Sequence, residues 1–149
     1  MPPMARFIGF GNVVLPVRDL PASIAAWTAL LGGPPAFQSD DFAAFSGDGV
    51  EIGLTAAPWV DHPLVFWAVE DIEQEHRALV AAGATAMTEI SDGSLAEVGT
   101  AEAAAGDNID PATGIVDMPG ARLAVLKAAD GNLIAITQEV PMDWSADQS

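Results

Sequence analysis

Histidine and cysteine, two side chains that often carry acid–base and metal chemistry, are scarce in this chain. The sequence has two histidines, His62 and His76, and no cysteine, so thiolate metal sites and cysteine nucleophiles are excluded together. It contains no nucleophile elbow, no phosphate-binding glycine loop and no His-x-x-x-His pattern. Glu51 could act as a general base if it were buried, although an acidic residue on a strand is more often exposed. The catalytic residues, and whether the chain is an enzyme at all, stay open from the residue types alone.

Two segments that could position such residues share one pattern: a strand, Val-x-Asp, an amphipathic helix and a glycine. The second copy, residues 64–84, has an acidic turn at Asp71 and an apolar stripe that includes His76. Asp71 and Gln74 have capping-box spacing, which marks a helix start at Asp71. The first copy, residues 12–33, carries the stripe Leu20, Ile24, Trp27 and Leu31 and ends at Gly32 and Gly33. The chain therefore contains one unit twice.

The repeat continues into two Asp-Gly turns, Asp48-Gly49 and Asp130-Gly131, each followed by a strand-like run. The copies are offset by 52 residues at the Val-x-Asp turns and by 82 at the Asp-Gly turns. About thirty residues are therefore inserted in the second copy, and residues 89–120 fit this insertion by composition. Within it, residues 95–105 predict a short helix. The insertion is interpreted either as a lid or as a plain surface loop.

This order of elements resembles the vicinal oxygen chelate superfamily, which comprises glyoxalases, bleomycin-resistance proteins and extradiol dioxygenases. The resemblance covers residues 6–139. It implies an α+β fold in which two paired βαβββ modules form a curved, eight-stranded mixed sheet around a cavity. We expect one domain over residues 1–149, with module one at about 6–57 and module two at about 63–139. Strands are expected at residues 7–17, 36–39, 42–45, 50–55, 64–69, 85–90, 122–127 and 132–138.

Composition agrees with one soluble domain, because half of the chain is hydrophobic and no apolar run reaches the roughly 18 residues of a membrane span. Five basic and 21 acidic residues give a net charge of −16, which repels phosphate backbones and anionic lipid. Nucleic-acid and membrane partners are therefore not expected. No signal peptide is evident, so a cytoplasmic location is the default expectation. A homodimer is expected because relatives commonly pair modules and because open sheet edges are apolar.

The resemblance also implies where a metal would bind. Metal-dependent relatives place a histidine five residues before the valine of Val-x-Asp and a Glu or His four residues after the glycine of the closing turn. Asn12, Leu64, Gly53 and Ala135 stand at these positions, and none is a ligand for a divalent metal. We therefore expect no metal and no cofactor. A displaced two-ligand site from His62 and Glu51 is the alternative, if the strand extends back far enough to turn His62 inward.

Two functions follow from this comparison. The favoured one is a metal-free binding protein similar to the bleomycin-resistance branch, which would sequester an aromatic or cationic small molecule and so serve in antibiotic resistance. The alternative is a lyase, isomerase or dioxygenase of the same superfamily with a displaced or absent metal site. Inward-facing candidates for the ligand site combine an apolar lining with a few polar groups. They are Asn12, Val14, Glu51, Gly53, Thr55, Phe66, Leu133, Ala135 and Thr137.

Overall fold

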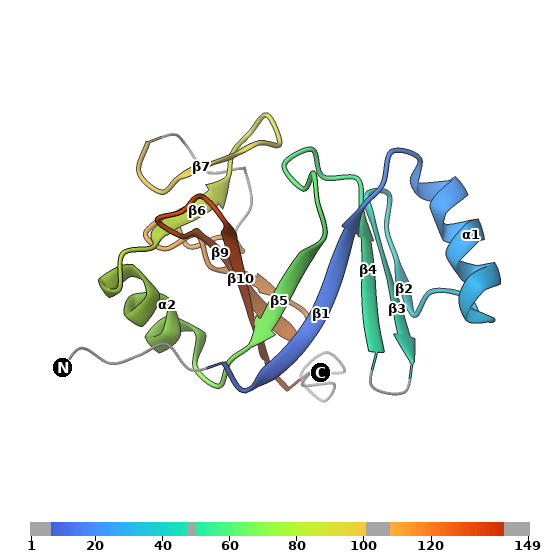
Figure 1. Ribbon diagram of the computed structural model, residues 1–149, viewed down its shortest axis with the longest axis horizontal. Helices are drawn as coiled ribbons and strands as arrows, with labels where there is room; N and C mark the ends of the chain where they lie inside the picture. The colour runs from blue at the N-terminus through green and yellow to red at the C-terminus, as the bar shows by residue number, and fades with distance from the viewer. Residues whose placement is uncertain (1–6, 48–49, 101–107, 142–149) are drawn as a thin grey trace, which may run out of the picture. The chain divides into compact units, whose positions relative to one another are not determined.

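The structure, a computed structural model, describes residues 7–47, 50–100 and 108–141. These residues form two helices and ten strands. The chain divides into two compact units, an N-terminal unit of Phe10–Phe66 and a C-terminal unit of Met1–Gly9 with Trp67–Ser149. Each unit carries one of the helices, as Figure 1 shows. The α+β class is confirmed.

The N-terminal unit has the βαβββ order that the sequence predicts. Its elements are β1 (Gly9–Pro16), α1 (Leu20–Leu31), β2 (Phe37–Gln38), β3 (Phe42–Gly47) and β4 (Val50–Thr55). The strands lie in the order β2-β3-β4-β1, and β4 is antiparallel to β3 but parallel to β1. The sheet is therefore mixed, because the helical crossover from β1 returns the chain in the same direction. The Asp48-Gly49 turn between β3 and β4 lies outside the described residues.

Helix α1 begins and ends where its sequence predicts. The Asp19 side chain accepts a hydrogen bond of 3.1 Å from the Ala22 N–H, which satisfies one of the free donors of the first turn. Pro21 lies in that turn, where its missing N–H costs nothing. Gly32 ends the helix in the left-handed conformation with φ of 81°. One face of α1 packs on the sheet over a core of Leu20, Ala43, Phe45 and Leu54.

The C-terminal unit repeats this order with two additional strands. Strand β5 (Leu64–Ala68) leads into it, followed by α2 (Ile72–Ala81), β6 (Thr85–Glu89), β7 (Leu95–Glu97), β8 (Val116–Met118), β9 (Ala121–Lys127) and β10 (Leu133–Glu139). The order β10-β9-β6-β7 is antiparallel throughout. Strand β8 pairs with the first half of β9, and β6 pairs with the second half. Eight strands belong to the two copies of the repeat, and β7 and β8 are the two additional strands.

Helix α2 begins at a confirmed cap, because the Asp71 side chain accepts a hydrogen bond of 3.2 Å from the Gln74 N–H. The Ile72 N–H at the same end donates to Oε1 of Gln138 on β10, at 2.9 Å. This bond ties the start of the helix to the last strand. The hydrophobic core beneath the helix comprises Val69, Ile72, Leu79, Ile115, Ala124, Leu126 and Ile136.

The insertion differs from its prediction. Residues 95–97, expected to start a short helix, form β7 and pair with β6, so the helix prediction is wrong there. Residues 101–107 lie outside the described residues. Ile115 is 1% exposed and belongs to the core of the C-terminal unit, so this part of the insertion is structural. Neither described helix is long and apolar enough to cross a bilayer.

Candidate functional site

The sheet of the N-terminal unit carries an aromatic surface on the side that faces away from α1. Strand register places Val14, Gly53, Ala44 and Phe37 in one row across the four strands. Phe42, two residues before Ala44 on β3, shares this side. We call these five residues the aromatic face. Two of its members, Phe37 and Phe42, were missed by the sequence analysis.

The ring of Phe42 covers Gly53. A Cβ atom on Gly53 would come within 3.0 Å of two ring carbons of Phe42 and within 3.2 Å of Cγ2 of Val14. The ring centroid of Phe37 lies 6.4 Å from that of Phe42 at an interplanar angle of 45°, so the two rings form a tilted pair. Phe37 is 54% exposed. The aromatic face therefore has one accessible ring, that of Phe37, beside the Phe42 ring that lies over Gly53.

The sequence-predicted site residues of the N-terminal unit mostly share this side. Val14 and Gly53 belong to the aromatic face. Thr55 and Asn12 lie on the same side of the sheet, because each is two residues away from one of them along its strand. Thr55 is buried, and its Oγ1 accepts a hydrogen bond of 3.1 Å from the Ala57 N–H. Phe66 is buried on β5. Glu51 is exposed, as favoured for an acidic residue on a strand, so the alternative of a buried general base is not supported.

In the C-terminal unit, Leu133, Ala135 and Thr137 lie on one side of β10, opposite to the side that packs on α2. Ala135 pairs with Val125 of β9, which in turn pairs with Met87 of β6. Ala135 is buried, whereas Leu133 and Thr137 are half-buried. The structure thus groups the predicted residues in two sets, one in each unit. That all nine line one cavity stays a prediction.

A family model described as Glyoxalase/Bleomycin resistance protein/Dioxygenase superfamily matches residues 9–136. The chain belongs to this superfamily. The match spans both βαβββ repeats and the insertion between β6 and β9. No curated protein matches the sequence.

Solved structures of the glyoxalase superfamily share the fold at low sequence identity. Methylmalonyl-CoA epimerase from Mycobacterium tuberculosis is 15% identical with a TM-score of 0.61, and the match covers 100% of this chain and 97% of the epimerase. A superfamily member from Vibrio splendidus 12B01 is 17% identical with a TM-score of 0.52, covering 88% and 99%. The Mn(II)-bound glyoxalase from Novosphingobium aromaticivorans is 19% identical with a TM-score of 0.57, covering 92% of this chain but 40% of that one.

The four positions at which the resemblance implies metal ligands do not carry residues that fit a metal. Gly53 lies under the Phe42 ring, and Leu64 and Ala135 are buried aliphatic residues. Asn12 supplies only a neutral amide. Within the part of the chain that the structure describes, no three His, Cys, Asp or Glu side chains gather closely enough to hold an ion. A side chain long enough to ligate from position 53 would have to displace the aromatic ring.

The displaced site is not formed either. Strand β5 starts at Leu64, so His62 is not drawn into the strand and is not turned inward. Its Nδ1 lies 2.6 Å from Oδ1 of Asp61, and both side chains are exposed. The hydrogen bond and charge of His62 lower the pKa of Asp61 below its ordinary value. Among the described residues, no hydrogen bond or ion pair joins His62 to Glu51, so nothing in the structure supports the alternative of a displaced two-ligand site.

The second histidine is buried in the C-terminal unit. His76 is 4% exposed on the inner side of α2, and its Nε2 has no hydrogen-bond partner. Burial lowers the pKa of His76, and the nearby Arg77 lowers it further. A hydrogen bond with the Thr113 backbone and the Asp110 carboxylate act in the opposite direction but do not compensate. His76 is therefore part of the packing between α2 and the sheet, and one of its ring nitrogens is unsatisfied.

We expect acidification to destabilise the protein through His76. Its folded pKa lies below the unfolded value of about 6.5, so the unfolded state binds the proton more tightly. The stability that neutral His76 contributes is present above about pH 6.5 and is lost as pH falls through the folded pKa. Melting temperatures measured between about pH 7.5 and pH 5 should fall less steeply in His76→Gln than in the wild type.

His62→Gln is the matched control, because His62 is exposed and is the chain's other histidine. This variant should keep the wild-type slope. Equal slopes in the wild type and His76→Gln would show that carboxylate titration alone sets the pH dependence.

Proposed function

We propose that the chain is a metal-free small-molecule binding protein of the glyoxalase/bleomycin-resistance type, which sequesters a flat aromatic ligand. The observation that carries this proposal is the Phe42 ring over Gly53. The resemblance to metal-dependent members implies a carboxylate or histidine at this position. An aromatic ring at this position cannot coordinate an ion, but it can stack against an aromatic ligand. Phe37 supplies the accessible ring of the pair.

The charge of the protein favours an aromatic cation over a neutral ligand. The net charge is −16, and such a field raises the local concentration of cations and their association rate. Glu51 lies two residues before Gly53 on β4, so by strand geometry it is on the same side at about 7 Å. A ligand stacked on Phe37 could place its positive charge near this exposed carboxylate. Antibiotics that combine aromatic rings with cationic groups, bleomycin among them, fit this chemistry.

We expect binding of a phenanthridinium dye such as ethidium to depend on Phe37. Phe37→Ala should weaken binding about three- to tenfold, since one stacked aromatic pair contributes roughly 0.5–1.5 kcal/mol. Fluorescence titration gives the affinity, and thermal shifts with bleomycin and other aromatic cations extend the test. Leu30→Ala is the matched control, because Leu30 is an exposed apolar side chain on the helix of the same unit.

Glu51→Gln separates the cationic from the aromatic part of this proposal. It should weaken binding of the phenanthridinium cation but leave neutral phenanthridine unaffected, and added salt should reduce the difference. Saturable binding that neither Phe37→Ala nor Glu51→Gln alters would place the ligand elsewhere. Absence of binding by every aromatic cation tested would contradict the proposed function.

A further inference from the structure

A row of polar side chains lies next to the aromatic face on the sheet of the N-terminal unit. Ser46 on β3 pairs with Glu51 on β4, so their side chains point to the same side of the sheet. On β1, Asn12 lies beside Glu51, because the two residues directly precede a pair in the parallel register of β1 and β4. We call Ser46, Glu51 and Asn12 the polar row.

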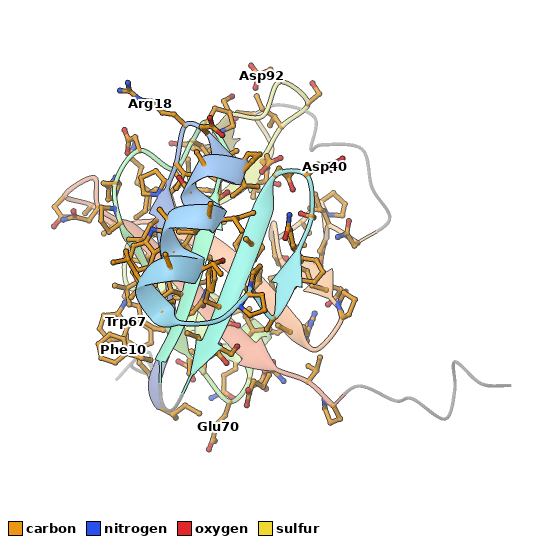
Figure 2. All side chains as sticks on the ribbon, turned by 90° about the vertical axis from the view of Figure 1, so that its right-hand side faces the viewer. Phe10, Arg18, Asp40, Trp67, Glu70 and Asp92 are labelled. Carbon is orange, nitrogen blue, oxygen red and sulfur yellow. The ribbon has the colours of Figure 1, made fainter. Side chains whose placement is uncertain are left out.

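The polar row runs alongside the aromatic face at a fixed separation. Each of its members is two residues from a member of that face on the same strand, which corresponds to about 7 Å. Neighbouring members of the row are about 4.8 Å apart, because they lie on adjacent strands. Helix α1 packs on the opposite side of this sheet, which is the side in front in Figure 2. No residue of α1 therefore lies over the polar row or the aromatic face.

The side chains of the polar row are not paired within the protein. Among residues 7–47, 50–100 and 108–141, no side-chain hydrogen bond or ion pair joins them to each other or to another residue. Asn12 is half-buried, whereas Ser46 and Glu51 are exposed. A half-buried amide without a protein partner is expected to bind water or a ligand. The row therefore has its hydrogen-bonding capacity available for a ligand.

The unit that carries the polar row has little positive charge. Arg18 is the one Lys or Arg between Phe10 and Phe66, against six Asp and Glu residues. It follows β1, six residues after Asn12. Its labelled side chain lies just beyond the start of α1 in Figure 2 and extends away from the helix. A positively charged group is therefore the ligand group that the polar row attracts.

The polar row is also rich in hydrogen-bond acceptors. An ionised carboxylate accepts at two oxygens and donates nothing, and the Ser46 hydroxyl and the Asn12 amide oxygen add an acceptor on either side. A planar amidinium or guanidinium group carries several N–H donors and forms paired hydrogen bonds with a carboxylate. A quaternary nitrogen has the same charge but no donor. The polar row is therefore able to distinguish cations by their N–H donors.

We infer that the ligand of the aromatic face is an aromatic amidine or guanidine, whose ring lies on that face and whose cationic group donates to Glu51 and to its neighbours in the polar row. The inference rests on the proposed function and narrows it from aromatic cations in general to those with N–H donors. Ser46 and Asn12 are then the residues that determine specificity. The separation of the two rows sets about 7 Å between the ring and the cation.

Three two-ring probes test the inference by calorimetric titration and thermal shift. 2-Naphthamidine has a cation with N–H donors, 1-methylquinolinium has a cation without them, and 2-naphthamide has donors without the charge. The amidine should bind about tenfold more tightly than either of the other two, because hydrogen bonds between charged groups are roughly twice as strong as neutral ones.

Asn12→Ala and Ser46→Ala should each reduce this preference for the amidine about three- to tenfold, since each removes one acceptor beside Glu51. Gln38→Ala is the matched control. Gln38 is exposed and pairs with Ala43, so it lies on the side of the same sheet that packs on α1. This variant should keep the wild-type preference, and the melting temperatures show that each variant is folded.

The outcomes separate the inference from the proposed function on which it rests. Equal affinities for the three probes, lost in Phe37→Ala, would overturn the inference and leave the aromatic site intact. A preference for the amidine that survives both Asn12→Ala and Ser46→Ala would also overturn it. If none of the probes binds, both the inference and the proposed function are contradicted.

Discussion

Replacing Gly114 with alanine is expected to destabilise the protein by about 3–5 kcal/mol, a large part of the roughly 5–15 kcal/mol that holds a domain together. Gly114 has a φ of 81°, which costs an L-residue about 1–2 kcal/mol. In addition, a Cβ atom there would collide with the Met87 carbonyl oxygen, which belongs to the backbone and cannot rotate away. The part of the insertion around Gly114 would have to move away from β6 to relieve this clash. Chemical denaturation measures the loss.

Gly131→Ala is the matched control for this effect. Gly131 has a similar φ of 94°, but a Cβ atom at this position meets nothing within 4 Å. Alanine should therefore cost only the backbone strain of about 1–2 kcal/mol. Equal losses in the two variants would show that the close contact between Gly114 and Met87 contributes nothing.

Truncation of Ile115 to alanine is the second change with a large expected effect. Ile115 belongs to the insertion, yet it is 1% exposed and packs in the core beneath α2. Removing a buried isoleucine side chain costs about 2–5 kcal/mol through lost burial and the cavity that remains. A lid or a plain surface loop would instead tolerate the change within about 0.5 kcal/mol. Denaturant titration distinguishes these results.

Ile109→Ala serves as the control in the same insertion, because Ile109 is only half-buried and bridges to Val116. Its loss should be clearly smaller than that of Ile115→Ala. If both variants unfold at the wild-type midpoint, the insertion is a surface segment and the structural role of Ile115 is refuted.

The repeat made most of the fold predictable from the sequence. Asp19 and Gly32 mark the two ends of α1, and Asp71, whose side chain accepts from the Gln74 N–H, marks the start of α2. Both helices were therefore placed correctly. The Asp130-Gly131 turn likewise fixed the β9–β10 hairpin through local bonds to Asn132. The insertion was harder to predict. Alanine-rich composition favoured a helix after Leu95, but pairing with β6 overrides that local preference.

The candidate site was less predictable, because its contacts depend on strand register. The sequence placed Gly53 and Val14 on one side of the sheet. The position of the Phe42 ring over Gly53, however, depends on how β3 aligns with β4. That alignment is set across the turn and not by local spacing. Exposure of Glu51 and His62 is likewise a result of where the strands begin and end. The lack of metal-ligating residues at the four positions implied by the resemblance, by contrast, follows from the residue types alone.

Elemental analysis tests most directly whether this superfamily member binds its ligand without a metal, as we propose. The protein should be purified from medium containing manganese, iron, nickel and zinc and washed at high ionic strength, because an acidic surface retains cations non-specifically. We expect no stoichiometric divalent metal and a melting temperature that neither chelators nor added metal ions change. One tightly bound metal per chain, whose removal lowers the melting temperature, would contradict the account.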